Sequence, residues 1–274
     1  MTPPIPLAAV IGYPAAHSRS PRLHGHWLAR YAIAGHYVPL QIAPADFEAA
    51  LALLPRLGFR GANVTLPHKE AALALATNAT HEARRIGAAN TLVFTKAGIA
   101  ADNTDAYGFA CNILDHRPDW RPRTAAVIGA GGAARAVLAA LLDRGATEVR
   151  LSNRTADRTA RLAAEFGAAV HPVDWQARSE MLAGCDTLVN ATALGMDGKP
   201  PLALSLDALP ADAIVNDLVY TPLETDLLAA AWARGNTAID GLGMLLHQAV
   251  PGFERWFRMR PSVDAALRQA VLAP

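Results

Sequence analysis

The chain has 274 residues, of which 52% are hydrophobic, and 25 Lys and Arg against 24 Asp and Glu give a net charge of +1. The length suits one large or two medium domains, and a near-neutral charge without blocks of one sign argues against nucleic acid or an anionic membrane as the main partner. The apolar runs are too short to span a bilayer, the first residues lack the pattern of a secretory signal, and two cysteines make no disulfide framework, so we expect a cytoplasmic protein.

Apolar runs typical of strands alternate with Ala- and Leu-rich runs typical of helices along the whole chain. The pattern predicts strands at 7–11, 36–40, 60–64, 90–94, 125–128, 148–151, 187–190, 213–216 and 237–239. It predicts helices at 21–34, 44–57, 69–75, 132–143, 156–166 and 224–234. Because strands alternate with helices, we expect an α/β fold whose parallel sheets are covered by helices on both faces.

Two seams divide the chain. A connecting helix at 107–114 leads into a Pro-rich turn at 117–123, after which a new strand begins. A second seam lies at 240–243, and helices at 244–256 and 262–272 follow it. We therefore expect one domain before the first seam and another between the two seams.

Histidine spacing gives no sign of a metal site. The nine histidines form no HExxH motif, and the two cysteines form no Cys-x-x-Cys motif. His24 and His26 have the spacing of neighbours on a strand but lie in a segment that is predicted to be helical, which makes them a poor ligand pair. We expect no metal.

A glycine-rich turn joins the strand at 125–128 to the helix at 132–143. Its sequence from Gly129 to Ala134 follows the pattern G-x-G-x-x-A. In this pattern the glycines let the backbone approach a pyrophosphate, and the amides of the helix N-terminus face its charge. Because a strand precedes the motif and a helix follows it, the sequence predicts a dinucleotide site and not merely a tight turn.

The end of the next strand indicates which dinucleotide binds. An NAD site usually has an acid about twenty residues after the glycine motif, but this strand ends in Ser152-Asn153-Arg154-Thr155, and Arg158 lies one turn further on. A guanidinium group suits a 2′-phosphate, so the sequence favours NADP. The alternative is that both arginines are ordinary solvated charges at the start of a helix.

Lys69 is one of only three lysines in the chain and follows the strand at 60–64. A lysine amine can give up and take back a proton, whereas arginine stays protonated, so Lys69 is a candidate acid/base group. The alternative is an ordinary loop charge, since Lys96 and Lys199 lie in plain loop segments. Asp105 belongs to the polar cluster Asp102-Asn103-Thr104-Asp105 at the first seam and could pair with Lys69, keeping its amine oriented and charged. The alternative is an ordinary loop with two carboxylates, which this cluster by itself favours.

Ser18 and Ser20 precede the helix at 21–34. Two hydroxyls at this spacing beside the start of a helix can reach one small anion, such as a carboxylate. The alternative for Ser20 is an N-cap followed by Pro21 at the first helical position, which is favourable capping chemistry by itself. Ser18 is not needed for that cap.

Taken together, these segments resemble the shikimate dehydrogenase family. The matching pieces occur in the family's order and cover almost the whole chain. They are SRSP at 18–21, NVTLPHK at 63–69, Asn90-Thr91, DNTD at 102–105, GAGGAAR at 129–135, NRT at 153–155, NAT at 190–192 and DGLGM at 240–244.

The resemblance implies the reversible, NADPH-dependent reduction of 3-dehydroshikimate to shikimate, a step on the route to aromatic amino acids. It implies an α/β protein with a substrate-binding and catalytic domain over 1–106, joined by C-terminal helices 244–274, and a doubly wound Rossmann domain for NADP over 107–243. The implied catalytic pair is Lys69 and Asp105, with Lys69 as acid/base. The implied substrate residues are Ser18, Ser20, Asn63, Thr65, Asn90, Tyr220 and Gln248. The implied cofactor residues are Gly129, Ala130, Gly131, Gly132, Ala133, Asn153, Arg154, Thr155, Arg158, Thr192, Leu218, Gly241 and Met244.

Three positions depart from the family pattern. Ala106 stands where a Gly usually follows DNTD, His81 stands where an acid is common, and Leu218 replaces a common Met of similar volume. We expect Ala106 not to abolish activity and Leu218 to have a mild effect, and we assign no role to His81.

Three other functions are compatible with parts of the sequence. One is a quinate/shikimate dehydrogenase that uses NAD, which the paired serines and the NRT segment disfavour. Another is a paralogue that acts on an aminated or otherwise altered ring. The third is a dinucleotide-binding regulatory module without catalysis, which the presence of both Lys69 and Asp105 disfavours. The sequence leaves monomer and homodimer open.

Overall fold

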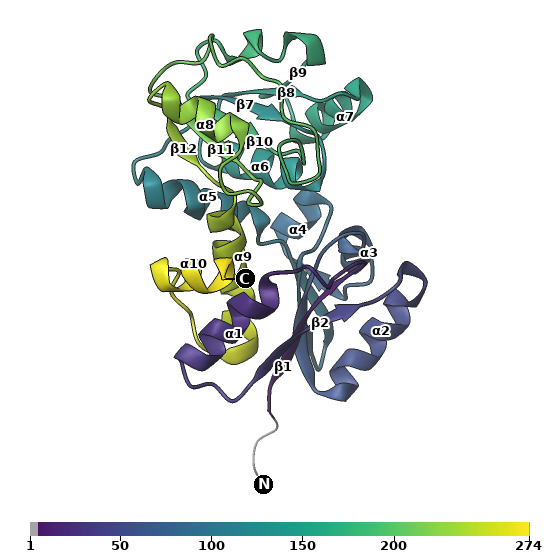
Figure 1. Ribbon diagram of the computed structural model, residues 1–274. Helices are drawn as coiled ribbons and strands as arrows, with labels where there is room; N and C mark the ends of the chain where they lie inside the picture. The colour runs from purple at the N-terminus through teal and green to yellow at the C-terminus, as the bar shows by residue number, and fades with distance from the viewer. Residues whose placement is uncertain (1–4, 274) are drawn as a thin grey trace. The chain divides into compact units, whose positions relative to one another are not determined.

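The structure is a computed structural model, and it describes residues 5–273. The chain forms two compact units, one made of residues 5–104 and 246–273 and the other of residues 105–245 (Figure 1). Each unit is built on one six-stranded sheet. In the described part of the chain, no helix is both long and apolar enough to cross a bilayer.

The first unit has a mixed sheet. Its strands are β1 (Leu7–Gly12), β2 (His36–Gln41), β3 (Phe59–Val64), β4 (Asn78–Ala79), β5 (Thr91–Thr95) and β6 (Gly98–Asp102), in the spatial order β2-β1-β3-β5-β6-β4. The prediction of parallel pairing is correct for β2, β1 and β3 but wrong for β5, which is antiparallel to both β3 and β6. The reason is that β5 and β6 form a hairpin with no helix between them, and β6 was not predicted.

Four helices of this unit are shorter than the sequence pattern predicts. The helix at 81–86 was not predicted, and the helix at 242–257 is longer than the predicted 244–256. The helices of the unit are α1 (Ser20–Arg30), α2 (Phe47–Leu53), α3 (Lys69–Ala74), α4 (His81–Ile86), α10 (Ala265–Leu272) and the C-terminal part of α9 (Leu242–Phe257). The helix predicted at 44–57 is divided into α2 and two flanking 3₁₀ turns, because Pro55 lacks the amide that would continue it. The last helix begins only at Ala265, where the Asp264 carboxylate caps it by accepting from the Leu267 amide at 3.0 Å.

The first sheet is covered on both faces. Alternate side chains of a strand point to opposite faces, and Ile11 packs on one face against Leu51 of α2. Tyr37 and Gly61 belong to the other face, where Trp256 of α9 packs. In Figure 1, α1 and α2 lie on opposite sides of β1 and β2.

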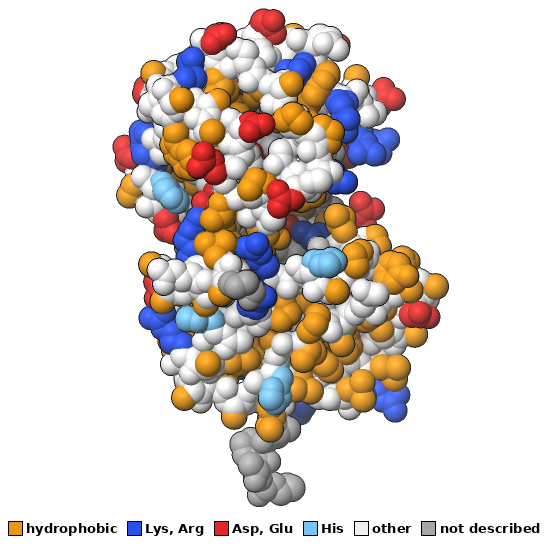
Figure 2. All heavy atoms as spheres, viewed as in Figure 1, with side chains coloured by type: hydrophobic (Ala, Val, Ile, Leu, Met, Phe, Trp, Pro, Cys, Tyr) orange, Lys and Arg blue, Asp and Glu red, His pale blue; other side chains and the backbone are white. Residues whose placement is uncertain are grey.

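Hydrophobic side chains also reach the surface of this unit. They gather around α2 and α3 on the face shown in Figure 2. Leu53, Leu57 and Leu66 are exposed by 49%, 65% and 74%. Exposed apolar areas are places where a protein can be covered by a partner.

Trp256 attaches α9 to the first sheet. Its side chain is fully buried, and its Nε1 donates to the carbonyl oxygen of Leu92 at 2.9 Å. A Cβ atom on Gly61 would lie 2.1 Å from both that oxygen and Nε1. The indole therefore reaches β5 only because position 61 has no side chain.

The second unit has a fully parallel sheet. Its strands are β7 (Thr124–Ile128), β8 (Glu148–Ser152), β9 (Val170–Val173), β10 (Thr187–Asn190), β11 (Ile214–Asp217) and β12 (Thr237–Ile239), in the order β12-β11-β10-β7-β8-β9. This order confirms the doubly wound fold, with its switch point between β7 and β10. The short β9 was not predicted, because Pro172 lies inside it, and proline is tolerated there only because β9 is an edge strand.

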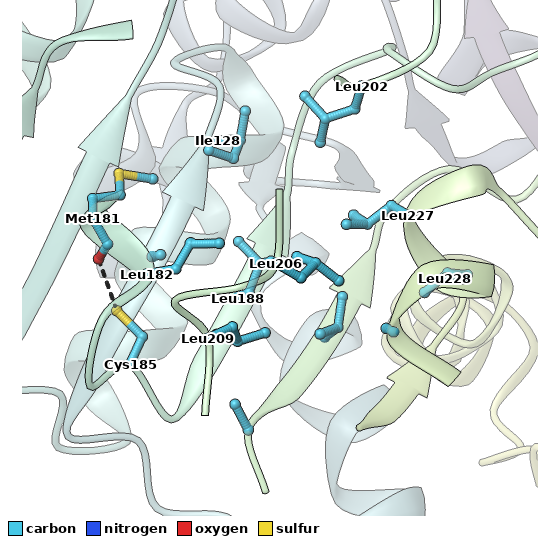
Figure 3. Packing of buried hydrophobic residues seen from close by; sticks show 14 residues of the cluster. Ile128, Met181, Leu182, Cys185, Leu188, Leu202, Leu206, Leu209, Leu227 and Leu228 are labelled. Atoms are coloured by element: carbon cyan, nitrogen blue, oxygen red, sulfur yellow. Dashed lines mark hydrogen bonds between the residues drawn. The ribbon is translucent and has the colours of Figure 1, made fainter. Parts of the chain in front are cut away.

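Four helices accompany this sheet, together with the first residues of α9. They are α5 (Asp105–His116), α6 (Gly132–Asp143), α7 (Ala156–Phe166) and α8 (Asp226–Ala233). Residues 191–213 contain neither helix nor strand. Leu202, Leu206 and Leu209 of this long segment pack in one buried cluster with Leu182 and Leu188, so the segment is part of the core (Figure 3).

A buried carboxylate connects the ends of β10 and β11. Asp217 accepts hydrogen bonds from Asn190 Nδ2 at 2.9 Å, Val219 N at 3.0 Å and Thr225 Oγ1 at 2.7 Å. Despite these donors, burial raises the pKa of Asp217 from 3.8 to about 6.

Gly61→Ala should lower the free energy of unfolding of the first unit by about 3 kcal/mol, since the new methyl group must displace either the indole of Trp256 or β3. Urea denaturation followed by tryptophan fluorescence measures the change. Gly25→Ala on α1 is the matched control, because a Cβ there meets nothing within 4 Å. It should instead add about 0.5–1 kcal/mol through lower chain entropy. An unchanged midpoint in Gly61→Ala would contradict the packing described.

Asp217→Asn should become more stable relative to the wild type as pH rises. The folded-state pKa of Asp217 is raised, so the folded protein holds its proton more tightly, and the stability this provides is complete below about 3.8 and lost as pH rises through about 6. At about 1.4 kcal/mol per pKa unit, the wild type loses up to roughly 3 kcal/mol that the amide variant keeps.

The measurement is the free energy of unfolding of both proteins at about pH 4.5 and about pH 7.5. The exposed Asp212 provides the control variant Asp212→Asn. A difference between Asp217→Asn and the wild type that is the same at both pH values would rule out a raised pKa.

Candidate active site

The predicted site residues of the first unit gather at one edge of its sheet. Strands β1 and β3 are parallel and end at this edge, while the antiparallel β5 begins there and β6 ends there. The register places Asn63 beside Thr91 and Thr91 beside Asp102. Residues that are far apart in sequence therefore meet in a single row.

The two serines lie at the start of α1, but the predicted N-cap at Ser20 is wrong. Ser20 is the first helical residue, and the N-cap is Arg19, whose side chain makes no capping hydrogen bond. Instead, Ser18 Oγ accepts from the amide of Ser20 at 3.3 Å, which is a local turn typical of serine. Ser18 thus has a structural role that the sequence assigned to Ser20, and Ser20 is buried, with 6% of its surface exposed.

The carboxamide of Asn63 is held in one orientation. Its Nδ2 donates to the carbonyl oxygen of Asn90 at 3.2 Å, and because a carbonyl only accepts, the NH₂ group must face it. Its Oδ1 then faces Tyr37 Oη, which donates to it at 2.7 Å. Burial raises the pKa of Tyr37 well above its ordinary value, so the phenol keeps its proton and remains a donor.

The carboxamide of Asn90 is also held in one orientation, because a backbone amide faces its oxygen. Its Oδ1 accepts from the amide of Thr104 at 2.9 Å and from Thr91 Oγ1 at 2.9 Å, and its Nδ2 donates to Gln248 Oε1 at 3.3 Å. Thr104 Oγ1 donates to the Gln248 carbonyl at 2.7 Å. The structure therefore brings together three predicted substrate residues, Asn63, Asn90 and Gln248.

Three supporting residues were not predicted, namely Tyr37, Thr91 and Thr104. Thr91 belongs to the Asn90-Thr91 motif and Thr104 to the DNTD motif, but the sequence does not show that their hydroxyls support the Asn90 carboxamide. The only indication for Tyr37 is strand register: Tyr37 of β2 and Asn63 of β3 point to the same face of the sheet, with β1 between them.

Lys69 is the first residue of α3, and the turn before it is firmly held. Thr65 N donates to the carbonyl of Ile11 at 2.8 Å, and His68 N donates to the carbonyl of Thr65 at 3.0 Å. The His68 ring stacks on Phe47 with 4.4 Å between centroids, and its Nε2 lies 2.8 Å from the carbonyl of Ile42. This turn places Thr65 and Lys69 at the edge that carries Asn63.

The two carboxylates of the DNTD segment have different surroundings. Asp102 accepts from Thr80 Oγ1 at 2.7 Å and from the Asn103 amide at 2.8 Å, and it lies 2.6 Å from the guanidinium of Arg255. Asp102 is therefore a structural ion-pair partner. Asp105 is the first residue of α5 and, like Tyr220, belongs to the second unit, so its pairing with Lys69 stays a prediction.

His24 is a core residue beneath this network. It is fully buried and stacks on Tyr37 with 3.9 Å between ring centroids. Burial lowers the pKa of His24 to about 3, so the ring is neutral and packs as an aromatic side chain. Within residues 5–273, no group of three or more His, Cys, Asp or Glu has an arrangement that would hold a metal ion.

The second unit has a pocket of about 390 Å³ at the carboxyl ends of its strands. It is lined by residues that follow four strands: Gly129, Ala130 and Gly131 after β7, Asn153 and Arg154 after β8, Trp175 after β9, and Ala191, Thr192, Ala193, Leu194, Lys199 and Pro200 after β10. This is where open α/β sheets bind their ligands, beside the switch point in strand order.

The glycine turn forms the floor of this pocket. Gly129 has a φ of +110°, and a Cβ on it would lie 2.8 Å from the carbonyl oxygen of Ala191, so only glycine fits. Gly131 is the N-cap of the twelve-residue α6, whose first turn contains no acidic residue. The free amides at this end suit a phosphate group.

Asn190 shapes the opposite wall. Its Oδ1 accepts from the amide of Thr192 at 3.1 Å and from Thr192 Oγ1 at 2.7 Å, while its Nδ2 donates to the carbonyl of Leu194 at 3.1 Å. The charged side chains of the lining are Arg154 and Lys199, and the lining contains no acid. The pocket therefore fits a ligand with phosphate groups.

Six of the predicted cofactor residues line this pocket: Gly129, Ala130, Gly131, Asn153, Arg154 and Thr192. The others lie outside the lining, and their cofactor contacts stay predictions; they are Gly132, Ala133, Thr155, Arg158, Leu218, Gly241 and Met244. Trp175, Lys199 and Pro200 were missed because they belong to segments without a recognisable motif.

Three parts of the sequence match known family profiles. Residues 10–92 match the "Shikimate dehydrogenase substrate binding domain", residues 112–195 match "Shikimate / quinate 5-dehydrogenase", and residues 241–272 match the "Shikimate 5'-dehydrogenase C-terminal domain".

Full-length relatives agree with these matches. The chain is 61% identical over 271 residues to a protein of Paracoccus denitrificans named shikimate dehydrogenase (NADP(+)), covering 98% of this chain and 96% of that one. It is 57% identical over 272 residues to a Cereibacter sphaeroides protein of the same name, covering 98% of each.

Solved structures show the same fold. The quinate dehydrogenase of Corynebacterium glutamicum in complex with NAD superposes with a TM-score of 0.91 at 32% identity, covering 98% of this chain and 99% of that one. The shikimate 5-dehydrogenase of Thermus thermophilus in complex with NADP(H) and shikimate superposes with a TM-score of 0.87 at 36% identity, covering 97% and 98%. With identity this high along nearly its whole length, the chain belongs to the shikimate dehydrogenase family.

Proposed function

We propose that the chain is an NADP-dependent shikimate dehydrogenase that reversibly reduces 3-dehydroshikimate to shikimate on the route to aromatic amino acids. The observation that carries this proposal is the 61% identity, over 98% of the chain, to a relative named for that activity. The geometry of both units agrees with it, because one has a polar edge suited to a small hydroxylated ring and the other has a phosphate-binding pocket.

The second unit would hold the cofactor. Gly129 to Gly131 and the start of α6 suit the pyrophosphate, and Asn153 and Arg154 stand where an NAD enzyme carries an acid. NADPH, when bound, supplies the hydride. Thr155 and Arg158 would flank the same anionic site, and Leu218, Gly241 and Met244 would form the remainder of the cofactor site.

The first unit would hold the substrate. Ser18 and Ser20 would bind the ring carboxylate, using their hydroxyls and the amides at the start of α1. Asn63, Asn90 and Gln248 would bind ring hydroxyls, and Thr65 and Tyr220 would complete the set. The hydrogen bonds that fix the Asn63 and Asn90 amides support this role, because pre-oriented donors lose less entropy on binding.

Lys69 would act on the proton. As the ring ketone is reduced, its oxygen needs a proton, and an ammonium group beside it both stabilises the developing negative charge and donates the proton. In the reverse direction the amine takes the proton back. Asp105 would orient the amine and favour its charged form.

Location and assembly are also part of the proposal. We infer a cytoplasmic protein, and its two cysteines, Cys111 and Cys185, which form no disulfide, fit that environment. We propose a monomer or a homodimer without a nucleic-acid or membrane partner. The exposed leucines of the first unit supply an apolar surface that a homodimer would cover.

Initial rates with shikimate and quinate, each with NADP and NAD, test the function directly. Shikimate with NADP should give the highest kcat/KM, at least about tenfold above the other pairs, since one charged hydrogen bond contributes about 1.5–3 kcal/mol. The highest value with quinate and NAD would assign the chain instead to the activity for which the Corynebacterium glutamicum structure is named.

Lys69→Ala should lower kcat by about 10²–10⁴, because general acid–base groups contribute that much. Lys69→Arg should also be poorly active, since guanidinium keeps its charge but does not release a proton. Thermal melts of both variants should stay within a few degrees of the wild type, and Lys96→Ala, at an exposed lysine in the β5–β6 turn, is the matched control. A near-normal kcat in the Arg variant would mean that charge alone suffices.

A further inference from the structure

Lys199 is an unexpected member of the cofactor pocket. The sequence places it in a plain loop, and no motif includes it. In the structure it lines the pocket with Arg154, and these two are the charged side chains of that lining. In the described part of the chain, neither of them forms an ion pair that would use up its charge.

The backbone around Lys199 is held in place. Gly195 N donates to the carbonyl of Pro200 at 2.8 Å, and Lys199 N donates to the carbonyl of Met196 at 2.9 Å. The amide of Asp197 donates to the carbonyl of Thr221 at 2.9 Å. Lys199 is therefore presented to the pocket by a closed turn and not by a loose loop.

The turn that carries Lys199 contacts Thr221, which follows β11, and the chain then runs towards residues that follow β9. After Pro200, Arg178 Nη2 donates to the carbonyl of Ala203 at 2.7 Å, and the amide of Ser205 donates to Ser179 Oγ at 3.2 Å. Arg178 and Ser179 belong to the connection between β9 and β10, so the segment after Pro200 packs against that connection.

The segment after Pro200 is anchored in the core of the unit. Leu202 and Leu206 pack in the same buried cluster as Met181 and Leu182, which also follow β9 (Figure 3). Trp175, on the same side of the sheet, completes the wall.

We propose that Lys199 is a second cationic contact for the 2′-phosphate of NADP and acts with Arg154; this rests on the proposed use of NADP. The pyrophosphate is served by uncharged groups, namely the glycine turn and the amides of α6. The two cations of the lining are then available for the second anionic group. A phosphate monoester carries nearly two negative charges at neutral pH, which two cations balance.

The two side chains have different tasks at such a site. A guanidinium group binds two phosphate oxygens in a planar fork, whereas an ammonium group is a mobile point charge on a flexible stem. Lys199 therefore adds affinity for any phosphate at this position, and it discriminates against a cofactor that has a hydroxyl there.

Calorimetric titration with two adenosine nucleotides separates the 2′-phosphate from the pyrophosphate. The first probe, adenosine 2′,5′-bisphosphate, has the 2′-phosphate, and the second, ADP, has a diphosphate and a free 2′-hydroxyl. Lys199→Ala should raise the Kd for the first probe about tenfold, as expected for one lost charged hydrogen bond. It should leave the Kd for ADP within about twofold, because that probe lacks the group that the lysine contacts.

Three companion variants sharpen the result. Arg154→Ala should show the same selective loss, Lys199→Arg should restore most of the affinity, and Lys96→Ala should change neither Kd. In steady-state assays, Lys199→Ala should raise the KM for NADP and leave the KM for NAD and both kcat values near those of the wild type.

Two outcomes would overturn the role of Lys199 and leave the proposed use of NADP standing. An equal loss for both probes would place Lys199 at the pyrophosphate or show that it only supports the turn, and no loss for either would make it an ordinary solvated charge. If the wild type itself bound adenosine 2′,5′-bisphosphate no better than ADP, the proposed preference for NADP would fail as well.

Discussion

The hydrogen bond between the indole of Trp256 and the carbonyl of Leu92 is the contact on which the first unit depends. It exists because Gly61 leaves room for the indole between β3 and β5. The same helix carries Gln248, whose carbonyl accepts from Thr104, and Arg255, which pairs with Asp102. A single buried contact thus positions a helix from the far end of the chain so that it completes the polar edge of the sheet.

The two units build their sites by different means. The first fixes side-chain amides through buried hydrogen bonds, and for Asn63 and Asn90 a backbone carbonyl or amide opposite the carboxamide sets which end is donor and which is acceptor. The second relies mainly on backbone, with a glycine turn, a free helix start and a loop shaped by Asn190. The first arrangement suits a ring that must be held in one orientation, and the second suits phosphates, which have no preferred face.

Sequence periodicity was sufficient for the elements with a strong pattern. Helices α6 and α7 begin and end where the sequence predicts, as do β10 and β12. The elements that were missed are short or contain a contrary signal, such as Pro172 in β9. Arg154 was predictable because the glycine motif fixes its distance along the chain. Tyr37 and Lys199 were not, since the neighbours of Tyr37 are set by strand register and those of Lys199 by a long segment without helix or strand.

The first unit is discontinuous, and this has a consequence for how the protein is made. Its face around Tyr37 and Gly61 is covered by α9, and α10 packs with α1, yet both helices are synthesised after the whole second unit. At about 5–20 residues per second, the ribosome needs roughly seven to thirty seconds to pass from one part of the first unit to the other. During that interval all six strands of the first sheet have been made, but the face that α9 covers is still open, which makes this face the part of the nascent chain most exposed to aggregation.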